Sequence, residues 1–238
     1  MIPIFEYLKE TLPSDHARQT RAIDIAGELV ADIKPQVIVD LGCGTGVTYD
    51  FFRKHAPDAR WIGIDIEESP EVNQRVRRDA EFRTYDGVNL PFADASLDFI
   101  FSNQVFEHVR YPEQLLADIR RVLKPGSIFV GQTSQLEPYH SYSLWNFTVY
   151  GFKRICDDAG LKVTQFRPGI DGLTLVERAF KGRPKEFSQW FNTESPKNKE
   201  IESLATAEGR RVNIINFRKL MNCGQFCFIC MKPDDDAK

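Results

Sequence analysis

The chain has 238 residues and a formal net charge of -3. This length suits one domain of moderate size with a substantial hydrophobic core. The mildly acidic balance argues against a general nucleic-acid binder, so we expect a small-molecule substrate and no nucleic acid. The sequence has no window of about eighteen apolar residues and no signal-like N-terminus, so we expect a cytoplasmic protein that does not contact a membrane.

The first predicted element is a helical lead-in over residues 1–35. Apolar side chains recur at helical spacing toward its end, and Pro35 stops the pattern. A buried strand follows over residues 37–41, which are rich in β-branched residues, and the chain then breaks into alternating glycines at Gly42, Gly44 and Gly46. Glycines leave no Cβ to hold a ligand away, so the backbone N–H groups here are open to an electron-rich group. The alternative is a tight strand-to-helix turn without a ligand.

Two acids end the next strands. Residues 60–65 predict a second buried strand that ends at Asp65, and residues 81–85 predict a third strand followed by Asp86. A carboxylate at the carboxyl end of the second parallel strand can accept hydrogen bonds from two ribose hydroxyls. The position of Asp65 also suits a nicotinamide dinucleotide. The even spacing of the glycines differs from the dinucleotide fingerprint, in which the third glycine comes three residues after the second.

The fourth strand and the residues after it supply polar candidates. Residues 99–102 predict this strand, and Asn103, Gln104 and His108 follow it. The carboxyl end of this strand adjoins the glycine loop, where an open α/β sheet binds its ligand. His108 has the pKa range of a general base, although a role in packing or loop orientation remains the alternative.

A second candidate base lies in the loop after the fifth strand. Residues 112–123 predict a helix with one apolar stripe, residues 127–131 predict the fifth strand, and the alternation of strands and helices indicates a parallel sheet covered on both faces. Residues 132–147 have no periodicity and contain aromatic, hydroxyl and carboxamide side chains, as binding loops do. We expect Tyr139, Tyr142 and Trp145 to bind the substrate, and we rank His140 ahead of His108 as general base. A lid that packs on its own aromatics is the competing account.

The C-terminal third predicts helices and a last strand. Residues 173–221 read as a helical insertion or cap that covers the substrate or binds a second subunit in a possible homodimer, and residues 222–232 contain the final strand. Cys223, Cys227 and Cys230 have a spacing also found around iron–sulfur clusters. Because side chains alternate along a strand, Cys227 and Cys230 would face opposite sides, so we expect buried small hydrophobes instead.

Several motifs occur together, in a fixed order, across about the first 135 residues. The motifs are Val37 to Gly46, Ile62-Gly63-Ile64-Asp65, Asp86 with Leu90-Pro91-Phe92, Leu97-Asp98-Phe99-Ile100, Val105-Phe106-Glu107-His108-Val109, and Arg121-Val122-Leu123-Lys124-Pro125-Gly126. With these motifs in this order, the sequence resembles the class I S-adenosylmethionine-dependent methyltransferases, in particular the type 11-like branch that acts on small molecules.

The resemblance implies a fold and a cofactor. The fold would be one Rossmann-like domain over residues 1–238, with a cofactor-binding core at 36–172, a seven-stranded, mostly parallel sheet with helices on both faces, and an antiparallel last strand. The cofactor would be S-adenosyl-L-methionine. The glycine loop would hold its methionine moiety, with Asp40 near the amino group, unless Asp40 only braces the loop. Asp65 and the neighbouring Ile66 would contact the ribose, Asp86 would accept the adenine amino hydrogen, Gly87 would meet a ring nitrogen, and Asn103 and Gln104 would line the methyl-donor side.

The activity implied is methyl transfer to a small molecule by in-line displacement. The Asn-Pro-Pro-aromatic signature associated with amino-group methylation is absent at 102–105, which favours a hydroxyl acceptor on a sugar-like or other biosynthetic intermediate. No His/Asp/Glu cluster has metal-ligand spacing along the chain, so we expect no metal. Two alternatives remain, a cofactor-binding protein of the same fold without methyl transfer and a nicotinamide-dependent oxidoreductase.

Overall fold

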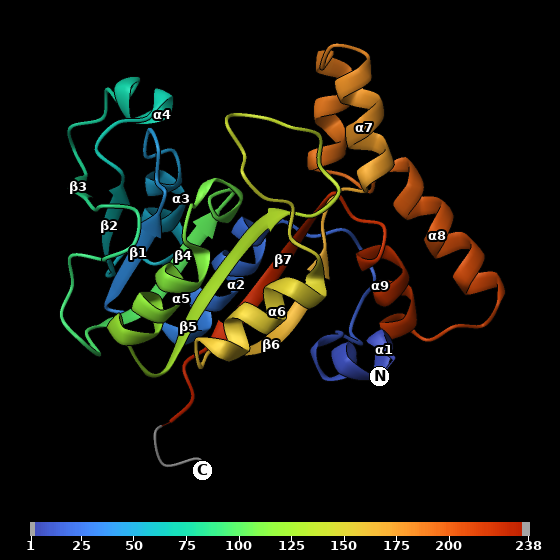
Figure 1. Ribbon diagram of the computed structural model, residues 1–238, viewed down its shortest axis with the longest axis horizontal. Coiled ribbons are helices and arrows are strands. Elements are labelled where there is room, and N and C mark those ends of the chain that lie inside the picture. Colours follow the sequence, from blue (N-terminus) through green and yellow to red (C-terminus); the bar gives the residue numbers. More distant parts are fainter. Residues whose placement is uncertain (1–2, 235–238) are drawn as a thin grey trace.

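The computed structural model describes residues 3–234, which form a central sheet between helices (Figure 1). The strands are β1 Val37–Leu41, β2 Arg60–Asp65, β3 Glu81–Thr84, β4 Leu97–Asn103, β5 Leu123–Ser134, β6 Lys162–Pro168 and β7 Gln225–Met231. The α-helices are α1 Ile4–Leu8, α2 Ala22–Ile33, α3 Thr48–His55, α4 Pro70–Asn73, α5 Pro112–Val122, α6 Val149–Asp158, α7 Gly172–Phe180, α8 Pro196–Ala207 and α9 Val212–Leu220. Three 3-10 helices are η1 Lys9–Thr11, η2 Phe106–His108 and η3 Lys185–Phe191.

The sheet has the strand order β3-β2-β1-β4-β5-β7-β6. Strands β1 to β5 are parallel to one another, and β7 is antiparallel to both of its neighbours, β5 and β6. The predicted Rossmann-like sheet with an antiparallel last strand is therefore confirmed. Because the order reverses direction between β1 and β4, their carboxyl ends open a crevice at this point.

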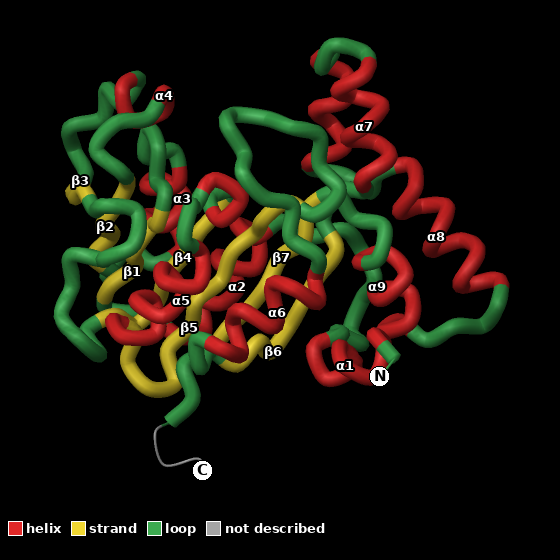
Figure 2. The backbone as a smooth tube through the Cα atoms, viewed as in Figure 1, coloured by secondary structure: helices red, strands yellow, loops and turns green. Residues whose placement is uncertain are grey.

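Each face of the sheet packs on its own hydrophobic core. Helices α5 and α6 cover one face and α2 and α3 cover the other, so the strands lie between helical layers (Figures 1 and 2). Side chains alternate between the cores as the period of two requires, with Val39 in the first core and Ile38 in the second. The same alternation separates the cysteines of β7. Cys230 lies in the first core and Cys227 in the second, and both thiols are buried and free, as predicted.

The helical lead-in is interrupted, which the helical spacing did not predict. Residues 12–21 run without helix between η1 and α2 and pack against α9. Pro13 cannot donate a backbone hydrogen bond, and its carbonyl instead accepts one from Asn216 Nδ2 at 2.9 Å. Lys219 Nζ donates to the Ala17 carbonyl at 2.6 Å. Tertiary contacts with a distant helix thus override the local helical pattern.

Four helical segments, α7, η3, α8 and α9, lie between β6 and β7. In Figure 1 they stand at the β6 side of the sheet, with α1 beside α9. Within residues 3–234, no helix combines the length and the apolar character needed to cross a membrane.

Candidate functional site

A cavity of ≈ 770 Å³ opens at the carboxyl ends of β1, β2 and β4. It gathers most of the residues that the sequence analysis singled out, from segments that are distant along the chain. These are Gly42, Gly44, Asp65, Ile66, Asp86, Gly87, Asn103, Gln104, His108, His140 and Tyr142. Four predicted residues, Asp40, Gly46, Tyr139 and Trp145, lie outside its lining.

The glycine loop forms the floor of this cavity. Gly42, Gly44 and Gly46 have positive φ angles of 72°, 51° and 81°, which favour glycine over residues with a Cβ. A Cβ on Gly42 would lie 2.2 Å from Cγ2 of Val105, so the loop also packs too tightly for a side chain there. Gly46 packs instead against Phe82, outside the cavity lining.

Asp65 ends β2 and faces this loop. Its Oδ2 accepts a hydrogen bond from the Gly44 N–H at 2.7 Å, and its Oδ1 accepts one from the Ile66 N–H at 2.8 Å. Burial raises the pKa of the Asp65 carboxyl above its usual value. Each carboxylate oxygen has a second lone pair, so Asp65 can still accept two hydroxyl groups from a ligand in the cavity.

Asp40 lies behind the loop and is 2% exposed. Its Oδ2 accepts a hydrogen bond from the Thr48 hydroxyl at the start of α3. Burial raises the pKa of this carboxyl to about 7. In this arrangement Asp40 connects β1 to α3 and braces the loop, which is the alternative that the sequence left open.

Arg75 also holds the loop, and the sequence analysis did not identify it. Its Nε donates to the Gly44 carbonyl at 2.7 Å, and its guanidinium lies 4.1 Å from the centroid of the Phe82 ring. Helix α4 ends at Asn73, and the chain beyond it folds back toward the loop. A cluster of arginines is usually solvated, so nothing in the local sequence distinguishes Arg75 from Arg77 or Arg78.

Asp86 and Gly87 form the opposite wall. Asp86 caps a turn, since its Oδ1 accepts the backbone N–H groups of Val88 at 2.9 Å and Asn89 at 2.6 Å. Hydrogen bonds from the side chain and backbone of Asn89 lower the pKa of Asp86, so this acceptor is ionised at neutral pH. Gly87 has a φ of 91°, and a Cβ placed on it would meet no atom within 4 Å.

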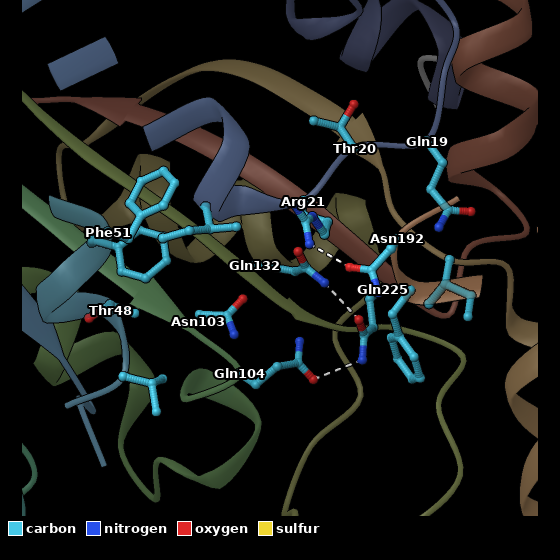
Figure 3. Close-up of a pocket in the computed structure, with 15 residues that line it drawn as sticks. Gln19, Thr20, Arg21, Thr48, Phe51, Asn103, Gln104, Gln132, Asn192 and Gln225 are labelled. Carbon is cyan, nitrogen blue, oxygen red and sulfur yellow. Dashed lines mark hydrogen bonds between the residues drawn. The ribbon is translucent and has the colours of Figure 1, made fainter. Parts of the chain in front are cut away.

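A second cavity of ≈ 430 Å³ lies beside the end of β4, and Figure 3 shows residues that line it. Asn103 and Gln104 line both cavities. Gln104 has a φ of 56°, an uncommon angle for a residue with a side chain, and its Oε1 accepts a hydrogen bond from Gln225 Nε2 at 3.0 Å. Its buried Nε2 has no partner among residues 3–234. An unpaired donor at the junction of two cavities suits an oxygen atom of a ligand.

His108 and His140, which line the larger cavity, form a cluster with the buried Glu107, which lies outside that lining. The ligand atoms of Glu107, His108 and His140 all lie within 4.8 Å of one another. The sequence shows no metal-ligand spacing, and the folded chain nevertheless brings these three side chains together. Sequence spacing conceals it, because His140 comes from the loop after β5 while Glu107 and His108 follow β4.

Glu107 is the buried member of this cluster. Its Oε2 accepts a hydrogen bond from Thr133 Oγ1 at 2.9 Å, and its Oε1 accepts one from Ser134 Oγ at 3.2 Å. Burial raises the pKa of this carboxyl to about 7, and burial also lowers the pKa of His108. The His108 and His140 rings meet edge to face, with centroids 5.4 Å apart.

The loop after β5 contributes less aromatic surface than predicted. Tyr142 lines the cavity, but Tyr139 is 68% exposed. Trp145 Nε1 donates to the Val109 carbonyl at 2.8 Å, so this indole anchors the loop. The loop therefore presents the segment 140–142 to the cavity.

Comparisons with known proteins agree with this geometry. Residues 39–131 match the family model described as "Methyltransferase domain". A probable S-adenosylmethionine-dependent methyltransferase of Mycolicibacterium smegmatis is 30% identical over 152 residues, covering 59% of this chain and 57% of that protein. A malonyl-(acyl-carrier protein) O-methyltransferase of Hahella chejuensis is 33% identical over 102 residues, covering 42% of this chain and 37% of that protein. The chain thus spans about half or less of the length of these relatives.

A solved structure extends the likeness to most of the fold. It is the complex between the Haloferax volcanii Trm112 methyltransferase activator and a putative methyltransferase. The match has a TM-score of 0.55 at 20% identity and covers 85% of this chain and 84% of the other. At this identity the likeness concerns the fold alone.

Proposed function

The chain belongs to the class I S-adenosylmethionine-dependent methyltransferases, and on that premise we propose that it transfers a methyl group from S-adenosylmethionine to a hydroxyl of a small molecule. One observation carries the proposal. Asp65 faces the glycine loop in the same cavity as Asp86, His108 and His140, so nucleoside acceptors and candidate proton acceptors share one space of ≈ 770 Å³. That volume accommodates a ligand of this size with room for an acceptor.

The lining suggests a position for each part of the cofactor. The ribose hydroxyls donate to Asp65, and the adenine amino group donates to Asp86. The methionine moiety runs over Gly42 and Gly44 toward the end of β4. There the unpaired Nε2 of Gln104 faces a ligand oxygen, which supports a role for Gln104 in binding the cofactor or the acceptor.

The reaction needs alignment more than activation. The acceptor oxygen forms a bond to the methyl carbon while the S–C bond breaks, the sulfonium becomes a neutral thioether, and the acceptor loses its proton. Holding the two reactants in line contributes on the order of 7–11 kcal/mol, whereas a positioned base contributes about 10²–10⁴-fold in rate. The rigid loop and strand ends around the cavity supply the alignment.

An imidazole at the acceptor end of the cavity takes the proton in this scheme. His140 is the first choice and His108 the second, and both line the cavity beside Tyr142. The missing Asn-Pro-Pro-aromatic signature at 102–105 favours oxygen over nitrogen as the acceptor, and a relative named as an O-methyltransferase agrees with this choice. A sugar-like or other hydroxylated biosynthetic intermediate fits a lining that contains imidazoles, carboxamides and three tyrosines.

The test is an acceptor screen with a donor that carries a labelled methyl group, preceded by calorimetry with S-adenosylmethionine, S-adenosylhomocysteine and NAD. We expect both sulfur nucleosides to bind, NAD not to bind, and label to appear in at least one hydroxylated acceptor. Binding of NAD instead would identify an oxidoreductase. Binding of the sulfur nucleosides with no turnover on any acceptor would identify a cofactor-binding protein without methyl transfer.

A further inference from the structure

We propose that Glu107, His108 and His140 bind one divalent transition-metal ion at the acceptor end of the cavity. The ligand set consists of two imidazoles and one carboxylate, and the three donor atoms lie within 4.8 Å of one another. The proposal that the ion binds depends on this geometry alone. A role for the ion in methyl transfer rests on the proposed function, and in that case His140 would be a metal ligand and not a general base.

The distances within the cluster suit ligands of a common ion. Glu107 Oε1 and His140 Nε2 are 3.9 Å apart, which is too long for a hydrogen bond. Two ligand bonds of ~2.0–2.2 Å that meet at one ion at a tetrahedral angle place the donor atoms roughly 3.3–3.6 Å apart. A separation of 4.8 Å, the limit for this cluster, therefore has to close by at most ~1.5 Å, a shift that rotation of two side chains can share.

Outer contacts orient each of the three ligands. His140 Nδ1 lies 3.3 Å from the Pro138 carbonyl oxygen. When Nδ1 carries the proton and donates it to this oxygen, the lone pair of Nε2 is available on the side of Glu107. His108 has a backbone hydrogen bond with Tyr142. Thr133 Oγ1 donates to Oε2 of Glu107, and Ser134 Oγ lies 3.2 Å from Oε1 of Glu107 and 2.6 Å from Oε2 of Glu137. Metal-binding histidines and carboxylates are typically fixed by partners of these kinds.

The charge around the cluster also favours a cation. Glu107 is fully buried, and a second carboxylate, Glu137, has its Oε1 3.9 Å from Nδ1 of His140. Among the described residues, Glu107 and Glu137 both pair with the same imidazole, that of His140. Two carboxylates that share one imidazole are costly to bury when both are ionised, and a divalent cation between them offsets that cost.

The donor set indicates the class of ion. Two histidines and one carboxylate occur in catalytic zinc sites and in non-haem iron(II) sites, whereas magnesium and calcium prefer oxygen ligands. Three protein ligands leave coordination positions open, and these face the cavity because His108 and His140 line it. A hydroxyl group bound there loses its proton more readily. The proton then passes to solvent or to Glu137, because a metal-bound Nε2 of His140 has no free lone pair.

Metal binding is measured on the untagged full chain after treatment with a chelator, without cofactor or acceptor. We expect calorimetry with Zn²⁺ to give about one equivalent and Co²⁺ to produce the visible absorption of a nitrogen- and oxygen-ligated site. His108→Ala and His140→Ala should each weaken binding at least about tenfold. Glu107→Gln keeps the side-chain volume and should do the same. His55→Ala is the matched control, since this exposed histidine lies on α3, away from the cluster.

Two results would overturn the inference. One is a folded wild-type chain that binds Zn²⁺ and Co²⁺ no more tightly than the double variant His108→Ala with His140→Ala. The other is a Co²⁺ spectrum dominated by thiolate charge transfer, which would place the ion on the cysteines. Binding of S-adenosylhomocysteine, measured separately on the same samples, tests the proposed function. If the chain binds S-adenosylhomocysteine but no metal ion, only the metal site is refuted. If it binds the metal ion but not S-adenosylhomocysteine, only the proposed function is refuted.

Discussion

Asp65 Oδ2 accepts the backbone N–H of Gly44 at 2.7 Å, so the acid at the end of β2 holds the loop that follows β1. The same carboxylate lines the cavity in which we place the cofactor. One side chain therefore fixes the loop and offers acceptors to a ribose. This double role makes Asp65 the most sensitive position for cofactor binding.

The variant Asp65→Ala should weaken binding of S-adenosylhomocysteine by about 10–100-fold. Hydrogen bonds to a charged group are worth about 1.5–3 kcal/mol, and each 1.4 kcal/mol is tenfold in affinity. Calorimetry measures the effect. Asp58→Ala is the control, because Asp58 is exposed just before β2 begins, at the opposite end of the same strand. Equal affinity in the two variants would remove Asp65 from the cofactor site.

Arg75→Ala should weaken the same binding by about 3–10-fold and cost little stability. The substitution removes the hydrogen bond from Nε to the Gly44 carbonyl, a contact worth on the order of 1 kcal/mol, and leaves that carbonyl near solvent. Arg78→Ala is the matched control, since Arg78 belongs to the same basic run and is exposed. A wild-type affinity in Arg75→Ala would show that the loop keeps its conformation without this brace.

The sequence predicted the elements that depend on local pattern. Apolar runs marked β1 and β2, and the ends of the second and third predicted strands marked Asp65 and Asp86, because hydrophobic pattern and strand ends are visible along the chain. The seven-stranded, mostly parallel sheet with an antiparallel last strand followed from the resemblance to a family, and the structure confirms it.

The features that were missed depend on contacts between distant segments. Arg75 reaches Gly44 only because the chain after α4 folds back, and His140 meets Glu107 only because the loops after β4 and β5 converge. The break in the lead-in at residues 12–21 has the same origin, since α9 satisfies the backbone there. No local period encodes such contacts.

Lys219→Met should destabilise the fold by ~2–4 kcal/mol. Lys219 is fully buried, and its Nζ donates to the Ala17 carbonyl at 2.6 Å and to Glu194 and Glu202 at 2.5 Å each. Methionine fills the volume but leaves these acceptors unpaired, which costs more than the loss of an exposed ion pair. A fall in the thermal midpoint of several degrees is the readout. Lys199→Met, at an exposed position on α8, should leave the midpoint unchanged.

Asp40→Asn should remove one component of the pH dependence of stability. Burial raises the pKa of Asp40 from 3.8 to about 7, so the folded chain holds this proton more tightly than the unfolded chain does. The resulting stabilisation is fully present below pH ~4 and is lost as the pH rises through ~7. Asparagine does not ionise and can still accept the Thr48 hydroxyl. The thermal midpoint of the variant should therefore rise relative to wild type as the pH increases from ~4 to ~7 and stay level above that, and Glu107 does not confuse the comparison because both proteins contain it. A constant difference across that range would mean that Asp40 is ionised throughout.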